Sequence, residues 1–360
     1  MDFSITIFLS LKGRFHFTKR WLDYMHSINF PFKILIADGD ASQEVKELVN
    51  LDIYNTLEIE YFQFEQKKNY ADYYLMMHEG MKKIKTRYVM ICDNDDFILM
   101  NGFIRILKYL RSHPDAVSRG GYINGFTLNN GMDNHSGTKF NLFKISNGHL
   151  RSSEPGNNII SYIDDCLSKH QSSHYNVNKT EVALKLSEEM AELNLSSLRL
   201  AERYQQLRLP SFGEVTYDSS AFYYLRQKGT SLSSGYNPIK SIMTNSLSND
   251  IELISNKISH VYEVVFDIKY SEVYAQLEES FLKDLTLDIS SHTMKYRFSE
   301  LYNFKLRFLS SKISFPYRNL KSRLQHQNCL KINKRASSKL IFEQFKHDLE
   351  AAKQHLLIKK

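Results

Sequence analysis

Two hydrophobic periods alternate along the first hundred residues. Runs rich in β-branched and apolar side chains predict buried strands over residues 4–11, 32–38, 57–64 and 88–92. Between them, apolar residues recur at the spacing of an amphipathic helix, over residues 12–28, 42–51 and 70–84. Because strands and helices alternate, the pattern predicts right-handed β-α-β units and a mostly parallel α/β sheet.

After residue 100 the pattern predicts longer helices and fewer strands. Helical spacing covers residues 103–113, 157–171, 180–194 and 196–209. Residues 116–137 are typical of a strand and loop, 172–179 of a short strand, and 213–227 of a strand or a helix. Beyond the loop at 228–238, residues 251–268, 270–285 and 338–357 are helical in pattern. The chain is therefore expected to hold an α/β domain over residues 1–240 and a mainly helical domain over 241–360.

The composition narrows the class of protein. The chain has 360 residues, 42% of them hydrophobic, which suits a globular protein with room for two domains. Its cysteines, Cys92, Cys166 and Cys329, are far apart, so neither a disulfide framework nor a zinc motif is predicted. No apolar run reaches 18 residues, and no signal peptide is recognisable. A cytoplasmic protein is expected.

The positive charge is concentrated towards the C-terminus. Residues 301–360 hold 14 Lys and Arg against 3 Asp and Glu, a balance of +11 within a net charge of +7. Aromatic residues such as Tyr302, Phe304 and Phe308 lie among them, which favours docking on an anionic membrane at the inner face of the cell. A helical packing domain with a basic exterior is the alternative. No nucleic-acid partner is expected, because no nucleic-acid-binding motif is present.

An acidic stretch follows the fourth predicted strand. The apolar run from Tyr88 to Cys92 leads directly into Asp93, Asn94, Asp95 and Asp96. Carboxylates this close repel one another unless a cation lies between them. Hard divalent cations prefer carboxylate oxygens and often share phosphate ligands, so a metal–diphosphate site is one interpretation. The other is a polar turn in which Asn94 or Asp96 caps the next helix.

The second predicted strand also ends in acids, Asp38 and Asp40. Ligands of parallel α/β sheets bind beyond the carboxyl ends of the strands. Both acidic ends are therefore expected at one edge of the sheet, which favours the ligand site.

The strand and helix order, with "ILIADGD" and "YVMICDNDDF", resembles the GT-A glycosyltransferases, particularly the family 2-like enzymes that build bacterial surface polysaccharides. The resemblance covers roughly residues 3–228. It implies a GT-A domain that uses Mn²⁺ or Mg²⁺ and transfers a sugar with inversion. The implied donor is a nucleotide-diphosphate sugar, with a UDP-sugar favoured, and the implied acceptor is a glycan or a lipid-linked molecule.

The resemblance also implies roles for single residues. Asp93, Asn94 and Asp95 match the D-x-D motif, in which Asp93 and Asn94 face the donor and Asp93 and Asp95 hold the metal. Asp96 matches an extra acid that often follows.

Other positions match the family along the chain. Ser10 and Arg14 lie in the loop expected to receive the nucleotide, and Asp38 matches an acid that binds uracil or ribose. Glu202, in "LRLAERYQQL", matches the catalytic base, whereas a surface ion pair is its alternative role. His174 and Tyr175 are weaker candidates for contact with the acceptor or the donor phosphate.

Two other functions fit part of the pattern. A nucleotidyltransferase also combines a nucleotide site with acidic metal ligands, but it usually has a glycine-rich loop after the first strand, and "SLKGRFHF" has one glycine. A non-catalytic nucleotide-sugar-binding protein would keep the same fold.

Overall fold

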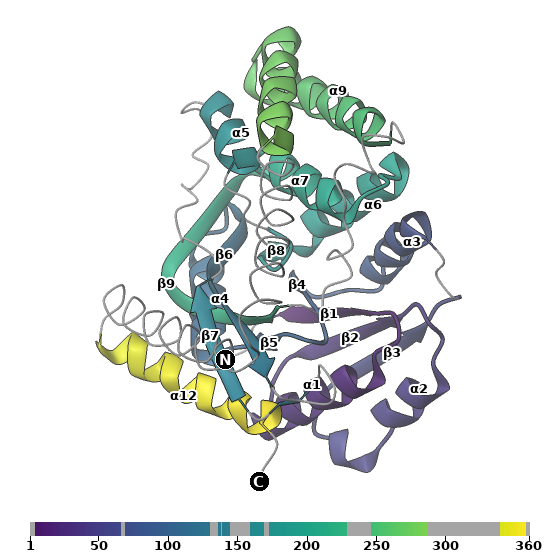
Figure 1. Cartoon of the computed structure of the whole chain (residues 1–360), viewed down its shortest axis with the longest axis vertical. Coiled ribbons are helices and arrows are strands. Elements are labelled where there is room, and N and C mark those ends of the chain that lie inside the picture. The colour runs from purple at the N-terminus through teal and green to yellow at the C-terminus, as the bar shows by residue number, and fades with distance from the viewer. Residues whose placement is uncertain are drawn as a thin grey trace, which may run out of the picture.

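The computed structural model describes residues 4–65, 69–129, 136–137, 139–144, 159–168, 173–228, 246–286 and 339–357. The first half of its sheet is parallel, as the sequence predicts. Four strands lie side by side in the order β3-β2-β1-β4 (Figure 1). They are β1 Ile5–Leu11, β2 Lys33–Asp38, β3 Ile59–Gln63 and β4 Tyr88–Cys92. Because they are parallel, β1, β2 and β4 all end at one edge.

Helices join these strands where helical spacing was predicted. They are α1 Phe15–Ser27, α2 Gln43–Val49 and α3 Tyr70–Met81, and a 3-10 turn that was not predicted, η1 Asp52–Tyr54, follows α2. Helix α1 buries Trp21 and Met25 against the sheet, whereas α3 packs Met77 against its other face. The sheet is thus covered on both faces, which explains why its strands are almost continuously apolar.

The second half of the sheet is mixed. Its strands are β5 Phe97–Ile98, β6 Ala116–Asn129, β7 Lys139–Lys144, β8 Val177–Lys179 and β9 Glu214–Gln227. Strand β8 pairs antiparallel with β4 and β6, and β6 pairs parallel with β9. The stretch at 213–227, predicted as a strand or a helix, is therefore a strand. Helix α4, Met100–Ser112, lies so close to β9 that a Cβ on Gly102 would come within 2.1 Å of the Phe222 carbonyl oxygen.

Most of the remaining helices build a second core beside the sheet. They are α5 Ile159–Ser168, α6 Thr180–Leu193, α7 Leu198–Arg208, the 3-10 turn η2 Leu209–Phe212, α9 Ser246–Phe266 and a helix over 270–286. Leu200 and Tyr204 of α7 share this core with Ile254 and Leu277. The predicted domain boundary near residue 240 lies outside the described residues, and side chains from before and after it pack in the same core.

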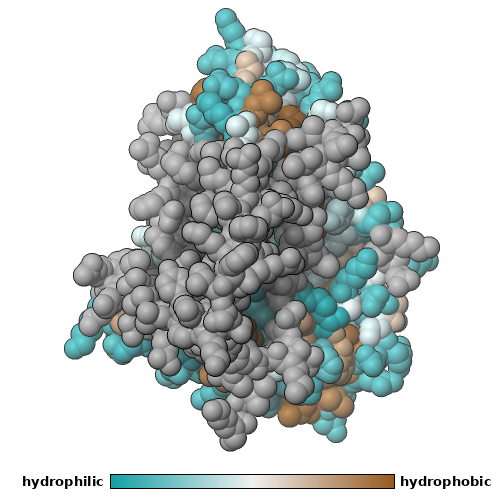
Figure 2. All heavy atoms as spheres, in the orientation of Figure 1, coloured by the Kyte–Doolittle hydropathy of each residue, from teal (hydrophilic) through white to brown (hydrophobic). Residues whose placement is uncertain are grey.

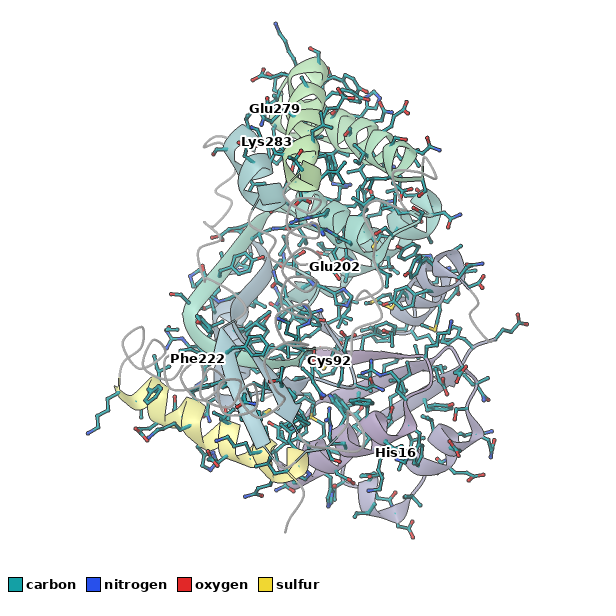
Figure 3. All side chains as sticks on the ribbon, viewed as in Figure 1. His16, Cys92, Glu202, Phe222, Glu279 and Lys283 are labelled. Atoms are coloured by element: carbon teal, nitrogen blue, oxygen red, sulfur yellow. The ribbon has the colours of Figure 1, made fainter. Side chains whose placement is uncertain are left out.

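Helix α12, Lys339–Leu356, packs on the first core rather than the second. It lies along β9 and α4 and is drawn in yellow in Figure 1. Phe345 packs against Phe222 at 4.8 Å between ring centroids, and Figure 3 places Phe222 beside this helix. The carboxylate of Asp348 accepts hydrogen bonds from the backbone N and Nδ2 of Asn101, at 2.8 and 2.7 Å.

Most of the predicted basic region, including residues 301–338, lies outside the described residues. Of the helices in the described ranges, none combines the length and hydropathy needed to span a membrane. On the face drawn in Figure 2, brown hydrophobic patches lie at the top, over the second core, and at the lower right, near α1 and α2. Among the described residues, exposed apolar side chains include Val264 on α9, Leu282 on the helix over 270–286 and Ile53 on η1. Single exposed apolar residues are normal on protein surfaces and need no partner.

Candidate functional site

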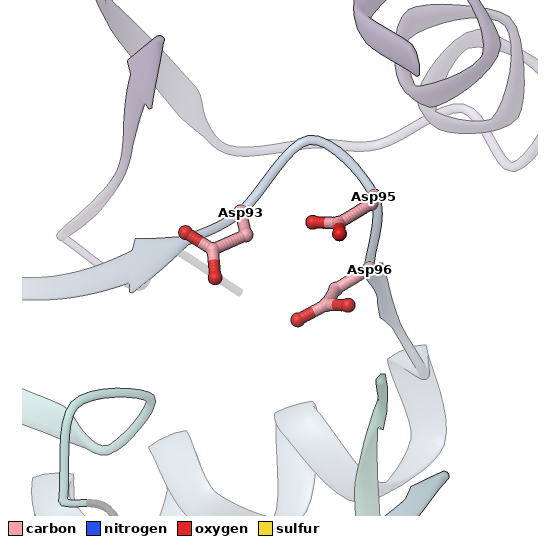
Figure 4. Close-up of side chains that lie close together, drawn as sticks. All are labelled: Asp93, Asp95 and Asp96. Carbon is pink, nitrogen blue, oxygen red and sulfur yellow. The ribbon is translucent and has the colours of Figure 1, made fainter. Parts of the chain in front are cut away.

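A tight turn after β4 gathers the three acids of the D-x-D stretch. The backbone N of Asp96 donates to the carbonyl oxygen of Asp93 at 3.2 Å, which closes the turn. One carboxylate oxygen from each of Asp93, Asp95 and Asp96 lies within 4.8 Å of the others, and Figure 4 shows the three side chains together. The spacing in the sequence therefore brings three carboxylates together at the edge of the sheet.

Each carboxylate of this acid turn has a different environment. Asp93 Oδ2 accepts from the Tyr175 hydroxyl at 2.7 Å, and Asp95 Oδ2 forms an ion pair with Arg14 at 2.8 Å. Asp96 Oδ1 accepts from the backbone N of Gln227 at 2.8 Å. Asp96 Oδ2 is buried and has no hydrogen-bond partner among the described residues.

Burial, followed by the charges of Asp95 and Asp93, raises the pKa of Asp96 well above the usual range. A divalent cation would relieve this repulsion, because carboxylate oxygens are the ligands that Mg²⁺ and Mn²⁺ prefer. The donor set and the unpartnered Asp96 oxygen thus fit the predicted metal.

The capping interpretation of this stretch is wrong. Helix α4 begins at Met100, its N-cap is Leu99, and it has no side-chain cap. Asn94 instead turns towards α1, where its Nδ2 donates to the Thr18 hydroxyl at 3.0 Å. The amide therefore ties the acid turn to the first helix.

A cavity of about 510 Å³ opens over the acid turn. Eight of the predicted site residues line it: Ser10, Arg14, Asp93, Asn94, Asp95, His174, Tyr175 and Glu202. They come from β1 and its loop, from the acid turn, from the segment before β8 and from α7. Such a concave site with convergent polar groups is the usual form of a small-molecule site.

Glu202 enters this cavity from the second core. It lies on α7, and Figure 3 shows it between the helical part and the sheet, across from Cys92 at the end of β4. The carboxylate of Glu202 helps to raise the pKa values of Tyr73, Tyr74 and Tyr175, although burial is the largest cause for each. The Glu202 carboxylate thus shares the cavity with the carboxylates of Asp93 and Asp95.

Asp38 has a different position from the other predicted residues. Its Oδ1 accepts from the backbone N of Asp40 at 2.9 Å, and its Oδ2 accepts from Ser42 N and the Tyr61 hydroxyl, at 3.0 and 2.7 Å. Asp38 is fully buried and, like Asp96, is not among the lining residues, whereas the next residue, Gly39, is. Asp38 therefore holds the loop after β2 in shape through hydrogen bonds to its backbone.

Two arginines near the acid turn had no role in the sequence-based prediction. Arg20 is buried and donates to the carbonyl oxygen of Asp95 and to Gln227 Oε1, both at 3.0 Å. Burial lowers the pKa of Arg20 to about 10, although the charges of Asp95 and Asp96 oppose this shift. Arg226, at the end of β9, lines the cavity itself. Arg20 is a charged residue of an amphipathic helix, and such residues are mostly exposed, so the sequence gave no sign that Arg20 is buried. Arg226 is remote from the acids in the sequence.

Comparison with known proteins supports the fold. No protein-family model matches the chain, and no curated protein matches its sequence. Among solved structures, S. aureus TarS 1–349 in complex with UDP-GlcNAc has a TM-score of 0.51 at 12% identity, and the match covers 99% of this chain and 93% of that one. The same fragment in complex with UDP has a TM-score of 0.52 at 13% identity, with 98% and 90% covered.

A TarS structure with a longer chain gives a TM-score of 0.51 at 13% identity, and the match covers 98% of this chain and 54% of that one. These likenesses agree over nearly the whole length of the chain. They confirm the fold expected from the GT-A resemblance, an α/β domain followed by a helical C-terminal part.

Proposed function

We propose that this protein is a metal-dependent, inverting glycosyltransferase that uses a UDP-sugar as donor. One observation carries the proposal: a single cavity is lined both by Asp93, Asn94 and Asp95 of the acid turn and by Glu202 of α7. The shared fold supports it, because the similar TarS structures hold UDP-GlcNAc and UDP. UDP-GlcNAc is therefore the first donor to test.

The donor end of the proposed site is the loop after β1 together with the acid turn. Ser10 and Arg14 would receive the nucleotide, and Asp93 and Asp95 would hold Mn²⁺ or Mg²⁺ beside its diphosphate. When bound, such a metal neutralises the negative charge that develops on the leaving diphosphate. Tyr175 holds Asp93 in place through its hydrogen bond, which orients a ligand that would otherwise rotate.

The acceptor end of the proposed site is the wall that carries Glu202. The carboxylate takes the proton of an acceptor hydroxyl as that oxygen attacks the anomeric carbon of the donor. A new C–O bond forms, the bond from the anomeric carbon to the diphosphate breaks, and UDP leaves with the electron pair. A single displacement of this kind inverts the anomeric carbon. The acceptor we propose is a glycan or lipid-linked molecule of bacterial surface polysaccharide synthesis.

A thermal-shift screen tests the donor site. UDP, GDP, CDP and TDP are each added with Mn²⁺, Mg²⁺ or EDTA to the wild type and to Asp95→Ala. A ligand that binds only the folded state raises the unfolding temperature by mass action. We expect a shift with UDP that needs metal and is absent in the variant. If no nucleotide shifts the folded wild type, the donor site is wrongly assigned.

Glu202→Gln separates catalysis from binding. We expect sugar transfer from UDP-GlcNAc to fall by about 10²- to 10⁴-fold, the usual contribution of a general base. Affinity for UDP should change little, because the variant keeps the shape of the side chain. Released UDP is measured by a coupled assay and affinity by calorimetry. A variant with full activity would exclude Glu202 as the base, and a wild type that binds UDP-sugars without turnover on any acceptor would favour a binding protein.

A further inference from the structure

Arg226 occupies a fixed position beside the acid turn. The next residue, Gln227, donates its backbone N to Asp96 Oδ1 at 2.8 Å and accepts at Oε1 from Arg20 at 3.0 Å. The backbone of Gln227 thereby ties the end of β9 directly to Asp96. Its side chain ties the strand to the acid turn a second time, through Arg20. Arg226 must therefore project from a rigid strand end, and it lines the cavity.

Aromatic rings support the Arg226 side chain. Its guanidinium carbon lies 5.2 Å from the centroid of the Tyr175 ring, and that ring stacks on Tyr224 at 4.6 Å. Both tyrosines are buried. Arginine stacked on an aromatic face loses little freedom when it binds a ligand, because its planar fork is already oriented.

The guanidinium of Arg226 has no hydrogen bond or ion pair within the part of the chain that the structure describes. Burial lowers its pKa, but Tyr175, Asp96, Glu202 and Asp93 together outweigh burial and raise it, so the side chain stays charged. Arg226 is partly buried, and arginine carries five N–H donors. Among the described residues these donors have no acceptor, so they can bind a ligand of the cavity that Arg226 lines.

The chemistry of the donors selects an oxyanion. A guanidinium fork matches two oxygens of a phosphate group in a bidentate arrangement. Such an oxyanion could belong to the nucleotide diphosphate or to an anionic acceptor. The nearness of Asp93 and Asp96 favours the first, since a metal held by the acid turn would bind the same diphosphate. We propose that Arg226 binds the diphosphate of the donor, an inference that rests on the proposed function.

Calorimetric titrations in the presence of Mn²⁺ test this role. UDP and uridine are titrated into the wild type, Arg226→Gln, Arg226→Lys and the control Lys228→Gln. Lys228 is exposed, lies two residues along the chain and is not a lining residue, so the control removes the same charge outside the cavity. We expect Arg226→Gln to weaken UDP binding about 10- to 100-fold, as for hydrogen bonds to charged groups, with uridine unaffected. Arg226→Lys should lie between, and the control should match the wild type.

The outcomes separate the two proposals. If the wild type binds UDP but Arg226→Gln binds it equally well, Arg226 does not contact the diphosphate, although the donor site stands. If UDP binding is unchanged while transfer falls, the oxyanion belongs to the acceptor and this assignment is overturned. Equal losses for uridine and UDP would also overturn it. If the wild type binds no UDP, the proposed function itself fails. Thermal unfolding without ligand checks the fold, and Arg226→Lys carries the test if Arg226→Gln is unfolded.

Discussion

Arg14 and Asp95 form an ion pair inside the proposed donor site. Their 2.8 Å contact gives a proposed metal ligand a cationic partner. Arg14 also has a left-handed backbone, with φ 67°, a conformation that costs a residue other than glycine about 1–2 kcal/mol. Strained residues of this kind are concentrated at ligand sites. We infer that metal and Arg14 compete for Asp95, and that the freed guanidinium turns to the nucleotide.

Arg14→Gln should therefore have opposite effects on the two ligands. We expect Mn²⁺ to bind about fivefold more tightly without nucleotide, since an ion pair near the surface contributes on the order of 1 kcal/mol. UDP should bind more weakly. Electron paramagnetic resonance of free Mn²⁺ measures the first effect and calorimetry the second. Lys19→Gln, on the exposed side of α1, is the control. An unchanged Mn²⁺ affinity would contradict the competition.

Prediction from sequence worked best for residues that are neighbours in the chain. Asp93, Asn94 and Asp95 could be found because one turn joins them. Tyr175 was identified but given a different role, since its bond to Asp93 spans 82 positions of the chain. Arg226 was missed because the contact that places it beside the acid turn, between Asp96 and its neighbour Gln227, spans 131 positions of the chain.

At the scale of elements, Asp218 of β9 joins three of them. It accepts from Arg105 of α4 at 2.6 Å, lies 3.3 Å from Arg119 of β6, and accepts from the backbone N of Ser220 at 2.9 Å. Burial alone would raise the pKa of Asp218, but the hydrogen bonds from Ser220 and Arg105 outweigh burial and lower this pKa below its ordinary value. The folded state thus favours the ionised carboxylate, and this preference contributes stability above the unfolded-state pKa.

Asp218→Asn should make the protein less stable in a pH-dependent way. At pH 7 we expect a loss of about 1.5–3 kcal/mol, the usual range for hydrogen bonds to charged groups. The difference should begin to shrink near pH 4 and vanish as the pH falls through the lowered pKa of the folded wild type, because Asp218 is then protonated in both states. Urea unfolding at several pH values measures the difference. A difference in the free energy of unfolding between wild type and variant that stays constant down to pH 3 would contradict the assigned role.

The elements themselves were predictable where the hydrophobic period was clear. Helices α1, α3 and α6 and strands β1 to β4 lie where the pattern placed them. The period failed at β9, where residues 221–225 are all buried, so neither a period of two nor one of 3.6 is visible. Contacts on both sides of this segment decide that it forms a strand and not a helix. The pattern of a single sequence does not contain these contacts.

At the scale of the whole molecule, the cavity lies between two cores. The acid turn belongs to the sheet, and Glu202 belongs to the helices, so both halves must be folded for the site to exist. Helix α12 adds to the first core from the far end of the described chain, away from the lining residues. Stability and ligand binding can therefore be separated on this helix.

Phe345→Ala tests that separation. Phe345 is 1% exposed, and removing a buried phenylalanine costs about 3–5 kcal/mol. We expect a loss of this size in the free energy of unfolding, with UDP affinity unchanged while the protein is folded. Leu340→Ala, on the same helix but 69% exposed, should change stability by less than about 0.5 kcal/mol. Equal losses from the two variants would mean that α12 does not pack as described.

The return of α12 to the first core also has a consequence for synthesis on the ribosome. When Leu225 of the sheet has been made, Phe342 and Phe345 are still roughly 120 residues away, on the order of ten seconds at ordinary elongation rates. During that interval the nascent sheet presents the apolar surface around Phe222 that α12 later covers. The newly made sheet thus remains without α12 during this time, and a chaperone that binds exposed apolar surface has this interval in which to act.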